Sequence, residues 1–483
     1  MVYYKGFLQK FHRRHSSKYG SLSPSNTENM SPPAHANGGN SNSHHHTPGE
    51  NGTASIVSEV TPLIANNLAH SSSANHHEPE PWGHHDRRAY VRYSGLVSYT
   101  TWQVLASNYV NVLLVFVPLG IIAGALGWSP SAVFCLNFVA IIPLAALLSF
   151  ATEELSAKLG QTIGGLMNAT FGNAVELIVS IVALKNGEIR IVQSSMLGSI
   201  LSNSLLVLGC CFLAGGISRS EQAFNETVAS TMSSLMAVAC ASLIIPATLY
   251  SVLPGSDKES EQHILVLSHG TAIILLLLYI LYLWFQLKSH AQLFAEVEAP
   301  PDSEDANHEE GPEGKTLGPV AAAFTLVVIT VAVAVCAEYL VDSIDSIVQT
   351  AHISKTFIGL ILLPIVGNAA EHVTAVVVAY KSKMDLAINV AIGSSMQIAL
   401  FVTPALVLLG WIMGIPMTLH FQTFETVVFF VSVLVMNYLI QDGKSNYLEG
   451  AMCIGTYIII AVAFYVYPDN AGDITGLAKS GFA

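Results

Sequence analysis

Long runs of apolar residues alternate with short polar connections from about residue 107 almost to the end of the chain. A helix needs about 20 apolar residues to cross ~30 Å of hydrocarbon, and eleven segments are long enough. The predicted spans are 108–128, 131–150, 160–184, 196–214, 227–249, 264–287, 320–339, 357–380, 388–411, 421–440 and 448–467. The pattern therefore predicts an all-α polytopic membrane protein with about 11 transmembrane helices.

The third and eighth predicted spans carry the same motif, Gly-Asn-Ala-x-Glu, at an offset of 195 residues. It ends at Glu176 in one copy and at Glu371 in the other, and at the same offset Gly198 matches Gly393. Because an odd number of spans separates the copies, the two halves must enter the membrane from opposite faces. This predicts one leading helix and two inverted-topology five-helix repeats, as in secondary transporters that bind substrate near the midplane.

Six regions follow from this pattern: a disordered cytosolic tail, a leading transmembrane helix, a first five-helix repeat, an acidic cytosolic linker, a second five-helix repeat and a short C-terminal tail. They are placed at 1–104, 105–130, 131–289, 290–316, 317–467 and 468–483. The tail has too few aliphatic residues to offset the entropy of ordering. The linker, with a net charge of −7, is either a solvated connection or a region that concentrates cations at the cytosolic mouth.

The composition supports this class and argues against others. The chain is 52% hydrophobic and 11% charged, whereas a soluble domain is about 25% charged. The net charge of −13 comes without a basic patch, which argues against nucleic-acid binding. All six cysteines fall in apolar runs, which is typical of buried thiols rather than of a disulfide framework.

The basic residues indicate an orientation. Every Lys and Arg beyond the tail lies between predicted spans or at their ends, with a weak excess on the side of the tail. By the positive-inside rule this predicts a cytosolic N-terminus. Eleven crossings then place the C-terminus on the opposite side.

Glu176 and Glu371 carry the candidate chemistry. Both lie well inside apolar spans, where an ionised side chain costs at least about 2.5–3.5 kcal/mol. No Lys or Arg is available in a span core to neutralise them. Each carboxylate must then hold a proton, bind a cation or alternate between the two. The alternative is a permanently protonated glutamate with a structural role. This explanation is less convincing for two glutamates at equivalent positions of a repeat than for one.

The neighbouring residues suit a hard cation such as Ca²⁺, which prefers oxygen ligands. Asn173 and Asn368 each precede a glutamate by three residues, which on a helix places amide and carboxylate on one face. In the spans that follow, Gln397 and Ser395 are the favoured additional ligands. The alternative for such hydroxyls is a bond to the carbonyl four residues back in their own helix.

Four other acidic residues and one histidine have two interpretations each. Glu153 and Glu154 are interfacial charges or a first binding site for incoming cations, and Glu338 and Glu425 relay protons or cap helix ends. His372 follows Glu371 but points about 100° away on a helix. It tunes the site or makes a packed polar contact.

The paired motifs GNAVE and GNAAEH, each followed by a Gly-Ser helix, resemble the two central repeats of the Ca²⁺/H⁺ (cation/proton) antiporters in the cation/Ca²⁺ exchanger superfamily. The resemblance covers about residues 105–467, and the stretch from NATFGNAVE to LGSILSN is most similar to fungal vacuolar calcium/proton exchangers. It implies that Glu176 and Glu371 bind Ca²⁺ and H⁺, with Asn173, Asn368 and Gln397 beside them. It also implies a vacuolar membrane.

These inferences predict a secondary antiporter that exchanges cytosolic Ca²⁺ for lumenal H⁺ by alternating access at a midplane two-glutamate site. The transported ions are substrates, and no resident cofactor is expected. Sodium coupling, a passive channel and Mn²⁺ as the main substrate stay open, although Gly-Asn-Ala replaces the Ser/Thr-rich motif of sodium/calcium exchangers. An enzyme is not expected, because no span carries His-Glu-x-x-His or a comparable pairing. The oligomeric state is not predicted.

Overall fold

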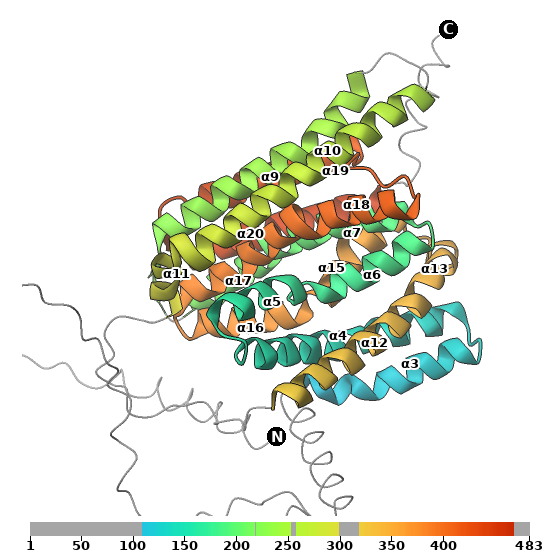
Figure 1. Ribbon diagram of the computed structural model, residues 1–483, viewed down its shortest axis with the longest axis horizontal. Coiled ribbons are helices and arrows are strands. Elements are labelled where there is room, and N and C mark those ends of the chain that lie inside the picture. Colours follow the sequence, from blue (N-terminus) through green and yellow to red (C-terminus); the bar gives the residue numbers. More distant parts are fainter. Residues whose placement is uncertain (1–108, 218, 253–256, 299–317, 468–483) are drawn as a thin grey trace, which may run out of the picture. The chain divides into compact units, whose positions relative to one another are not determined.

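The described part of the chain is almost entirely helical (Figure 1). The computed structural model describes residues 109–217, 219–252, 257–298 and 318–467. The predicted tail at 1–104, the linker beyond residue 298 and the C-terminal tail at 468–483 lie outside these residues.

The first half is a series of helices with local changes of pitch. It comprises η1 (Tyr109–Val115), α3 (Phe116–Ala125), α4 (Pro130–Ser156), α5 (Gln161–Phe171), α6 (Ala174–Lys185), α7 (Ile189–Leu201), η2 (Ser202–Val207), α8 (Leu208–Gly216), the short strand β1 (Gln222–Ala223), α9 (Glu226–Val252), α10 (Asp257–Trp284), η3 (Phe285–Ser289) and α11 (Ala291–Glu298).

The second half repeats much of this order. It comprises α12 (Pro319–Asp342), α13 (Ile344–Ala351), α14 (Lys355–Phe357), η4 (Ile358–Leu362), α15 (Leu363–Gly367), α16 (Ala369–Tyr380), α17 (Met384–Gln397), η5 (Ile398–Val402), α18 (Thr403–Met413), α19 (Thr423–Leu439), β2 (Lys444–Ser445) and α20 (Tyr447–Val466). The π-helical segments η2 and η5 occupy equivalent places after α7 and α17, and such segments often mark functional positions.

Local sequence accounts for several helix ends. Pro130 and Pro319 occupy first-turn positions in α4 and α12, where a missing N–H costs nothing. Gly414 ends α18 in the left-handed conformation, with φ 72°. Reciprocal capping boxes begin α19 and α20.

Every predicted span coincides with helix, but not every span is one helix. Seven helices in the described residues are long and apolar enough to cross a membrane alone, and two bent pairs would make nine. Shorter apolar helices, among them α16 and α19, cover other predicted spans. The prediction of an all-α polytopic membrane protein is confirmed, whereas the count of eleven stays a prediction. The eighth predicted span, 357–380, is divided into α14, η4, α15 and α16.

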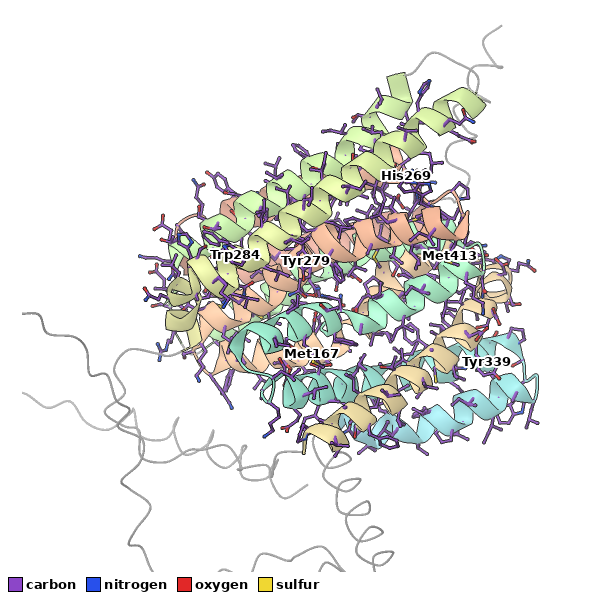
Figure 2. All side chains as sticks on the ribbon, in the orientation of Figure 1. Met167, His269, Tyr279, Trp284, Tyr339 and Met413 are labelled. Atoms are coloured by element: carbon purple, nitrogen blue, oxygen red, sulfur yellow. The ribbon has the colours of Figure 1, made fainter. Side chains whose placement is uncertain are left out.

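The helices lie side by side in one bundle with two recognisable ends (Figure 1). We call the end with α11 and the turn between α4 and α5 the linker end, and the end with α13 and the turn between α6 and α7 the far end. Outward side chains are largely apolar, as Figure 2 shows; Trp284 on α10 is 64% exposed, whereas Tyr279 on the same helix is 4% exposed. This distribution suits a lipid-facing surface.

A two-stranded antiparallel sheet joins the halves away from the helix cores. Gln222 in β1 pairs with Ser445 in β2, and Ala223 pairs with Lys444. β1 leads into α9, and β2 follows α19. The connections of the two halves are therefore held together directly.

Candidate ion-binding site

Both copies of the repeated motif lie at breaks between helices. The first helix pair, α5 and α6, bends by 48°. Asn173 is the N-cap residue of α6 and Asn368 that of α16, and Glu176 and Glu371 lie in the first turns that follow. Each motif therefore lies where one helix of its span ends and the next begins. Neither asparagine side chain makes a capping hydrogen bond to its own helix, so both amides are available for other contacts.

A hydrogen-bonded network connects residues from both halves. The Asn173 amide donates to Gln397 Oε1 at 2.7 Å. Ser394 Oγ lies 2.8 Å from Asn173 Oδ1 and 2.9 Å from Glu371 Oε2. The Asn203 amide donates to Ser394 Oγ at 2.9 Å. The network thus brings together three predicted residues, Glu371, Asn173 and Gln397.

The Ser394 hydroxyl limits the protonation states that satisfy this network. It has one hydrogen and two lone pairs, and it accepts from Asn203. Its single hydrogen can serve only Asn173 or Glu371 at one time. If Glu371 carries a proton, the carboxyl O–H donates to Ser394 and Ser394 donates to Asn173, so every contact is satisfied.

Glu176 packs against Gly367, where α15 ends and α16 is about to begin. Its side chain is buried, and a Cβ on Gly367 would lie 3.0 Å from its Oε1. It borders a cavity of about 10 Å³ that Ser195 and Ser199 also line, which is room for one water. Asn368 is fully buried, and neither polar atom of its amide has a hydrogen-bond partner. A buried amide in this state has unused capacity for a ligand.

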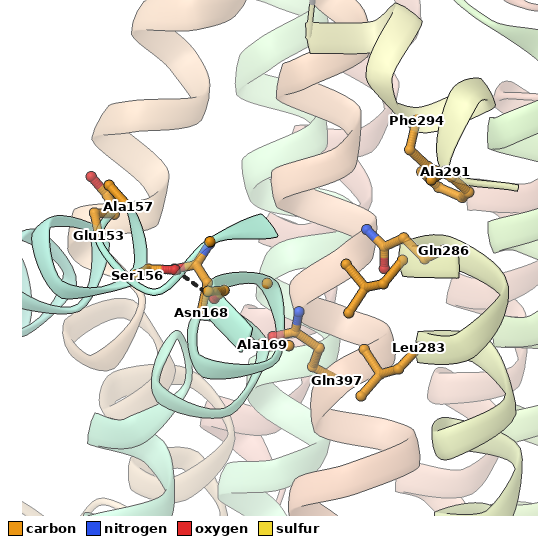
Figure 3. A pocket seen from close by; sticks show the side chains of 14 residues that line it. Glu153, Ser156, Ala157, Asn168, Ala169, Leu283, Gln286, Ala291, Phe294 and Gln397 are labelled. Carbon is orange, nitrogen blue, oxygen red and sulfur yellow. Dashed lines mark hydrogen bonds between the residues drawn. The ribbon is translucent and has the colours of Figure 1, made fainter. Parts of the chain in front are cut away.

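A much larger pocket leads to the network from the linker end (Figure 3). It has a volume of about 490 Å³. Glu153 and Ser156 line it near the turn between α4 and α5, Phe294 lines it from α11, and Asn168 and Gln397 line it deeper in the bundle. Gln397 therefore belongs both to the pocket wall and to the network around Glu371.

Ser395 is not brought to the glutamates. Its hydroxyl lies 3.0 Å from that of Ser204 and donates to the carbonyl of Ala391, four residues back in its own helix. Its neighbour Ser394 makes the contact with Glu371 instead. Ser394 and Asn203 were not among the residues favoured from the sequence.

The remaining polar candidates have clear partners. His372 contacts the Ser202 hydroxyl at 3.2 Å through Nε2, as a packed polar contact would. Glu338 pairs with Lys185 at 3.4 Å. Glu425 completes a capping box and pairs with Arg190. Glu153 accepts a hydrogen bond from Ser149 at 3.2 Å.

The donor set suits a hard cation better than a soft one. Within the described residues, no group of three or more His, Cys, Asp and Glu side chains gathers as a metal site, and no recorded ion pair there involves Glu176 or Glu371. An ion bound here would use carboxylate, amide and hydroxyl oxygens, which are the ligands of Ca²⁺.

Comparison with known proteins shows the family to which this chain belongs. The family described as sodium/calcium exchanger protein matches residues 129–288 and 321–466. The chain is 53% identical over 368 residues to the vacuolar calcium ion transporter of Schizosaccharomyces pombe, covering 76% of this chain and 87% of that protein. It is 44% identical to the Ca²⁺/H⁺ antiporter of Aphanothece halophytica, covering 74% and 96%.

Among solved structures, the Ca²⁺/H⁺ antiporter protein YfkE matches with a TM-score of 0.61 and 36% sequence identity. The match covers 74% of this chain and 99% of that one. The resemblance inferred from the repeated motifs is confirmed. The chain is a multi-pass membrane protein of a transporter family.

Proposed function

Because this chain belongs to the sodium/calcium exchanger protein family, we propose that it is a secondary active antiporter exchanging cytosolic Ca²⁺ for H⁺ from an acidic lumen. The similar proteins named above as a Ca²⁺/H⁺ antiporter and as a vacuolar calcium ion transporter support this activity. They also support a vacuolar membrane as its location.

One observation carries the choice of site. The large pocket ends at Gln397, and from there hydrogen bonds run through Asn173 and Ser394 to the Glu371 carboxyl. An ion entering the pocket therefore passes the Glu153 carboxylate and the amides of Asn168 and Gln397 before it reaches the Glu371 carboxyl. We assign Ca²⁺ binding to Glu176 and Glu371, with Asn173, Asn368 and Gln397 as supporting oxygen donors.

Proton coupling follows from competition for the same oxygens. Ca²⁺ requires deprotonated carboxylates, and the Ser394 network is fully satisfied when Glu371 is protonated. Binding of either ion excludes the other, so one site that faces the two sides in turn couples the two gradients. The residues of this chain orient the carboxylates and shield them from lipid.

The orientation is part of the proposal. The pocket opens at the linker end, where an acidic segment of this chain begins. With the linker in the cytosol, the arrangement described here is the cytosol-facing one. The N-terminus is then cytosolic as well.

The test uses reconstituted vesicles with an acidic interior. Glu176→Gln and Glu371→Gln keep side-chain size but remove the titratable carboxylate. Each is expected to lower proton-driven Ca²⁺ uptake by at least about a hundredfold, because a buried charged ligand is lost. Glu338→Gln, which removes an exposed far-end carboxylate, is the matched control and should keep the parental rate. Parental uptake in either site variant would refute the assignment.

Sodium coupling remains the second candidate because the family description includes sodium exchangers. The donor set also accepts Mn²⁺. A metal panel, with pH and sodium gradients imposed separately, distinguishes these activities.

A further inference from the structure

The far side of the site is closed by direct contact between backbones of the two halves. A Cβ on Gly198 in α7 would overlap the carbonyl of Leu360 in η4, and a Cβ on Gly359 would overlap the Ser194 hydroxyl. Only glycine permits this approach. No passage for an ion remains between α7 and η4 at these residues.

The equivalent positions at the linker end are apart. Gly393, the repeat counterpart of Gly198, would place a Cβ 3.6 Å from Met232 Cε and near nothing else within 4 Å. Gly165, the counterpart of Leu360, lines the large pocket together with Gly164. At these positions the two halves thus pack asymmetrically: α7 contacts η4 at the far end, whereas Gly393 in α17 makes no equivalent close contact with the other half at the linker end.

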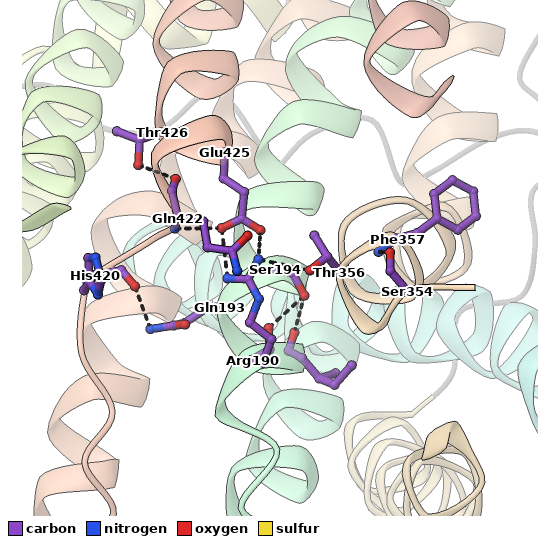
Figure 4. A network of polar contacts seen from close by, with 11 residues as sticks. Arg190, Gln193, Ser194, Ser354, Thr356, Phe357, His420, Gln422, Glu425 and Thr426 are labelled. Atoms are coloured by element: carbon purple, nitrogen blue, oxygen red, sulfur yellow. Dashed lines mark hydrogen bonds and ion pairs between the residues drawn. The ribbon is translucent and has the colours of Figure 1, made fainter. Parts of the chain in front are cut away.

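A partly buried ion pair lies at the closed end, where Arg190 in the first turn of α7 meets Glu425 in the first turn of α19 (Figure 4). Arg190 Nη1 donates to Glu425 Oε2 at 3.0 Å, and Nη2 donates to the other carboxylate oxygen and to Thr356 Oγ1 at 3.1 Å. Glu425 is 1% exposed. We call Arg190 and Glu425 the far-end ion pair.

The far-end ion pair connects three elements. Arg190 belongs to the first half, whereas Thr356 in α14 and Glu425 in α19 belong to the second. Separation of α7 from α14 and η4 would therefore break at least the bond to Thr356. The Arg190 side chain is 24% exposed and Glu425 is buried, so the charge left without a partner would be chiefly the Glu425 carboxylate, which is disfavoured unless water reaches it.

Neighbouring contacts extend the closure. Gln193, almost one turn beyond Arg190, donates to the backbone carbonyls of Thr418 and His420 at 3.0 and 3.1 Å (Figure 4). Burial, and then the Arg190 charge, lower the pKa of His420. Both causes favour the neutral form of the imidazole.

The other repeat has no copy of this pair. The position equivalent to Arg190 is Asp385, an acid, which accepts a hydrogen bond from the backbone N–H of Asn225. The far-end ion pair is therefore not a requirement of the repeated fold. It is an addition at the far end, where α7 contacts η4.

We propose that the far-end ion pair, together with Thr356, holds the far side of the exchanger closed while the linker side is open. Its rupture accompanies opening to the far side. This inference rests on the proposed alternation of one site between two faces, and it assigns Arg190 a positioning role rather than contact with the transported ion.

The test measures accessibility at both ends in the full-length chain with its six native cysteines replaced. Ser195→Cys, beside Glu176 in the small cavity, reports on the far side. Asn168→Cys, in the large pocket, reports on the linker side. Labelling rates with N-ethylmaleimide are compared with and without Arg190→Ala. We expect Arg190→Ala to raise the rate at Ser195→Cys at least about fivefold and to lower the rate at Asn168→Cys.

Two further variants make the result decisive. Lys185→Gln removes an exposed ion pair at the same end and should change neither rate. The double variant Arg190→Glu with Glu425→Arg should return both rates to within about twofold of the parent, since the pair is rebuilt with reversed polarity.

Three outcomes would overturn the proposal. The first is an unchanged labelling rate at Ser195→Cys in the Arg190→Ala variant. The second is a higher rate at both reporters, which would indicate general loosening of the fold. The third is that the double variant does not restore the parental rates. Labelling needs no ion gradient. Failure of the exchange proposal would appear separately, as Ca²⁺ uptake retained by Glu371→Gln.

Discussion

At the scale of single residues, the candidate site depends on which of two adjacent serines faces it. Ser394 connects Glu371, Asn173 and Asn203, whereas Ser395 faces Ser204 and its own helix. Two consecutive helical residues point about 100° apart. Because the two side chains are identical and only Ser394 belongs to the network, substituting each serine in turn tests whether the network affects Ca²⁺ binding.

Ser394→Ala is expected to lower the half-saturating Ca²⁺ concentration about two- to tenfold, because the network stabilises the protonated Glu371 that competes with Ca²⁺, and a neutral hydrogen bond contributes about 0.5–1.5 kcal/mol. Ser395→Ala should stay within about twofold of the parent. Initial rates of proton-driven Ca²⁺ uptake at varied Ca²⁺ check both. Equal effects of the two substitutions would remove Ser394 from the site.

The sequence was sufficient to single out Glu176 and Glu371, because a repeated acid in an apolar span is rare and expensive. It also indicated Asn173 and Gln397. It favoured Ser395, whereas Ser394 contacts Glu371, because the rotation of α17 depends on packing that the sequence does not reveal. The partnership of Arg190 with Glu425 joins positions 235 residues apart, and no local pattern predicts it.

At the scale of elements, glycine allows the helices of the two halves to touch. Gly198→Ala is expected to lower Ca²⁺ uptake at least about tenfold, because overpacking at a close backbone contact costs about 1–3 kcal/mol. The measurement is the initial uptake rate per reconstituted protein.

Gly455→Ala in α20 is the matched control. A Cβ there meets nothing within 4 Å, so the parental rate is expected. Parental uptake by Gly198→Ala would show that the contact between α7 and η4 is not needed for transport.

Hydropathy predicted where apolar helices lie but not where they break. Mean hydropathy over a span is insensitive to a change of pitch, so η2, η4 and η5 left no signal in it. The Gly-Asn pairs did mark the breaks before α6 and α16, since glycine and asparagine both weaken a helix interior. The offset of the repeat also aligned η2 with η5 closely.

At the scale of the whole molecule, the two halves have similar folds but pack differently at the two ends. This difference is what a single site that opens to one side at a time requires. If one site serves both ions, each proton displaced by Ca²⁺ should raise the half-saturating Ca²⁺ concentration by up to about tenfold per unit decrease in pH on the binding side. Vesicle uptake across a range of external pH at fixed internal pH measures this slope.

The same assay excludes the rivals. A protonophore should abolish net uptake, and an imposed sodium gradient should not restore it. A pH-independent Ca²⁺ affinity, or uptake that survives collapse of both gradients, would contradict a single shared site and favour a channel.

The small β1–β2 sheet adds a mechanical consequence. It ties the segment before α9 to the segment after α19, with the Phe224 N–H also donating to the carbonyl of Gly443 at 2.9 Å. These peripheral helices come from different repeats, so neither can slide along the membrane normal without pulling the other. α9 and α19 would then move together as a rigid unit. A displacement of one repeat would reach the other through the β1–β2 sheet and not only through the ion-binding site.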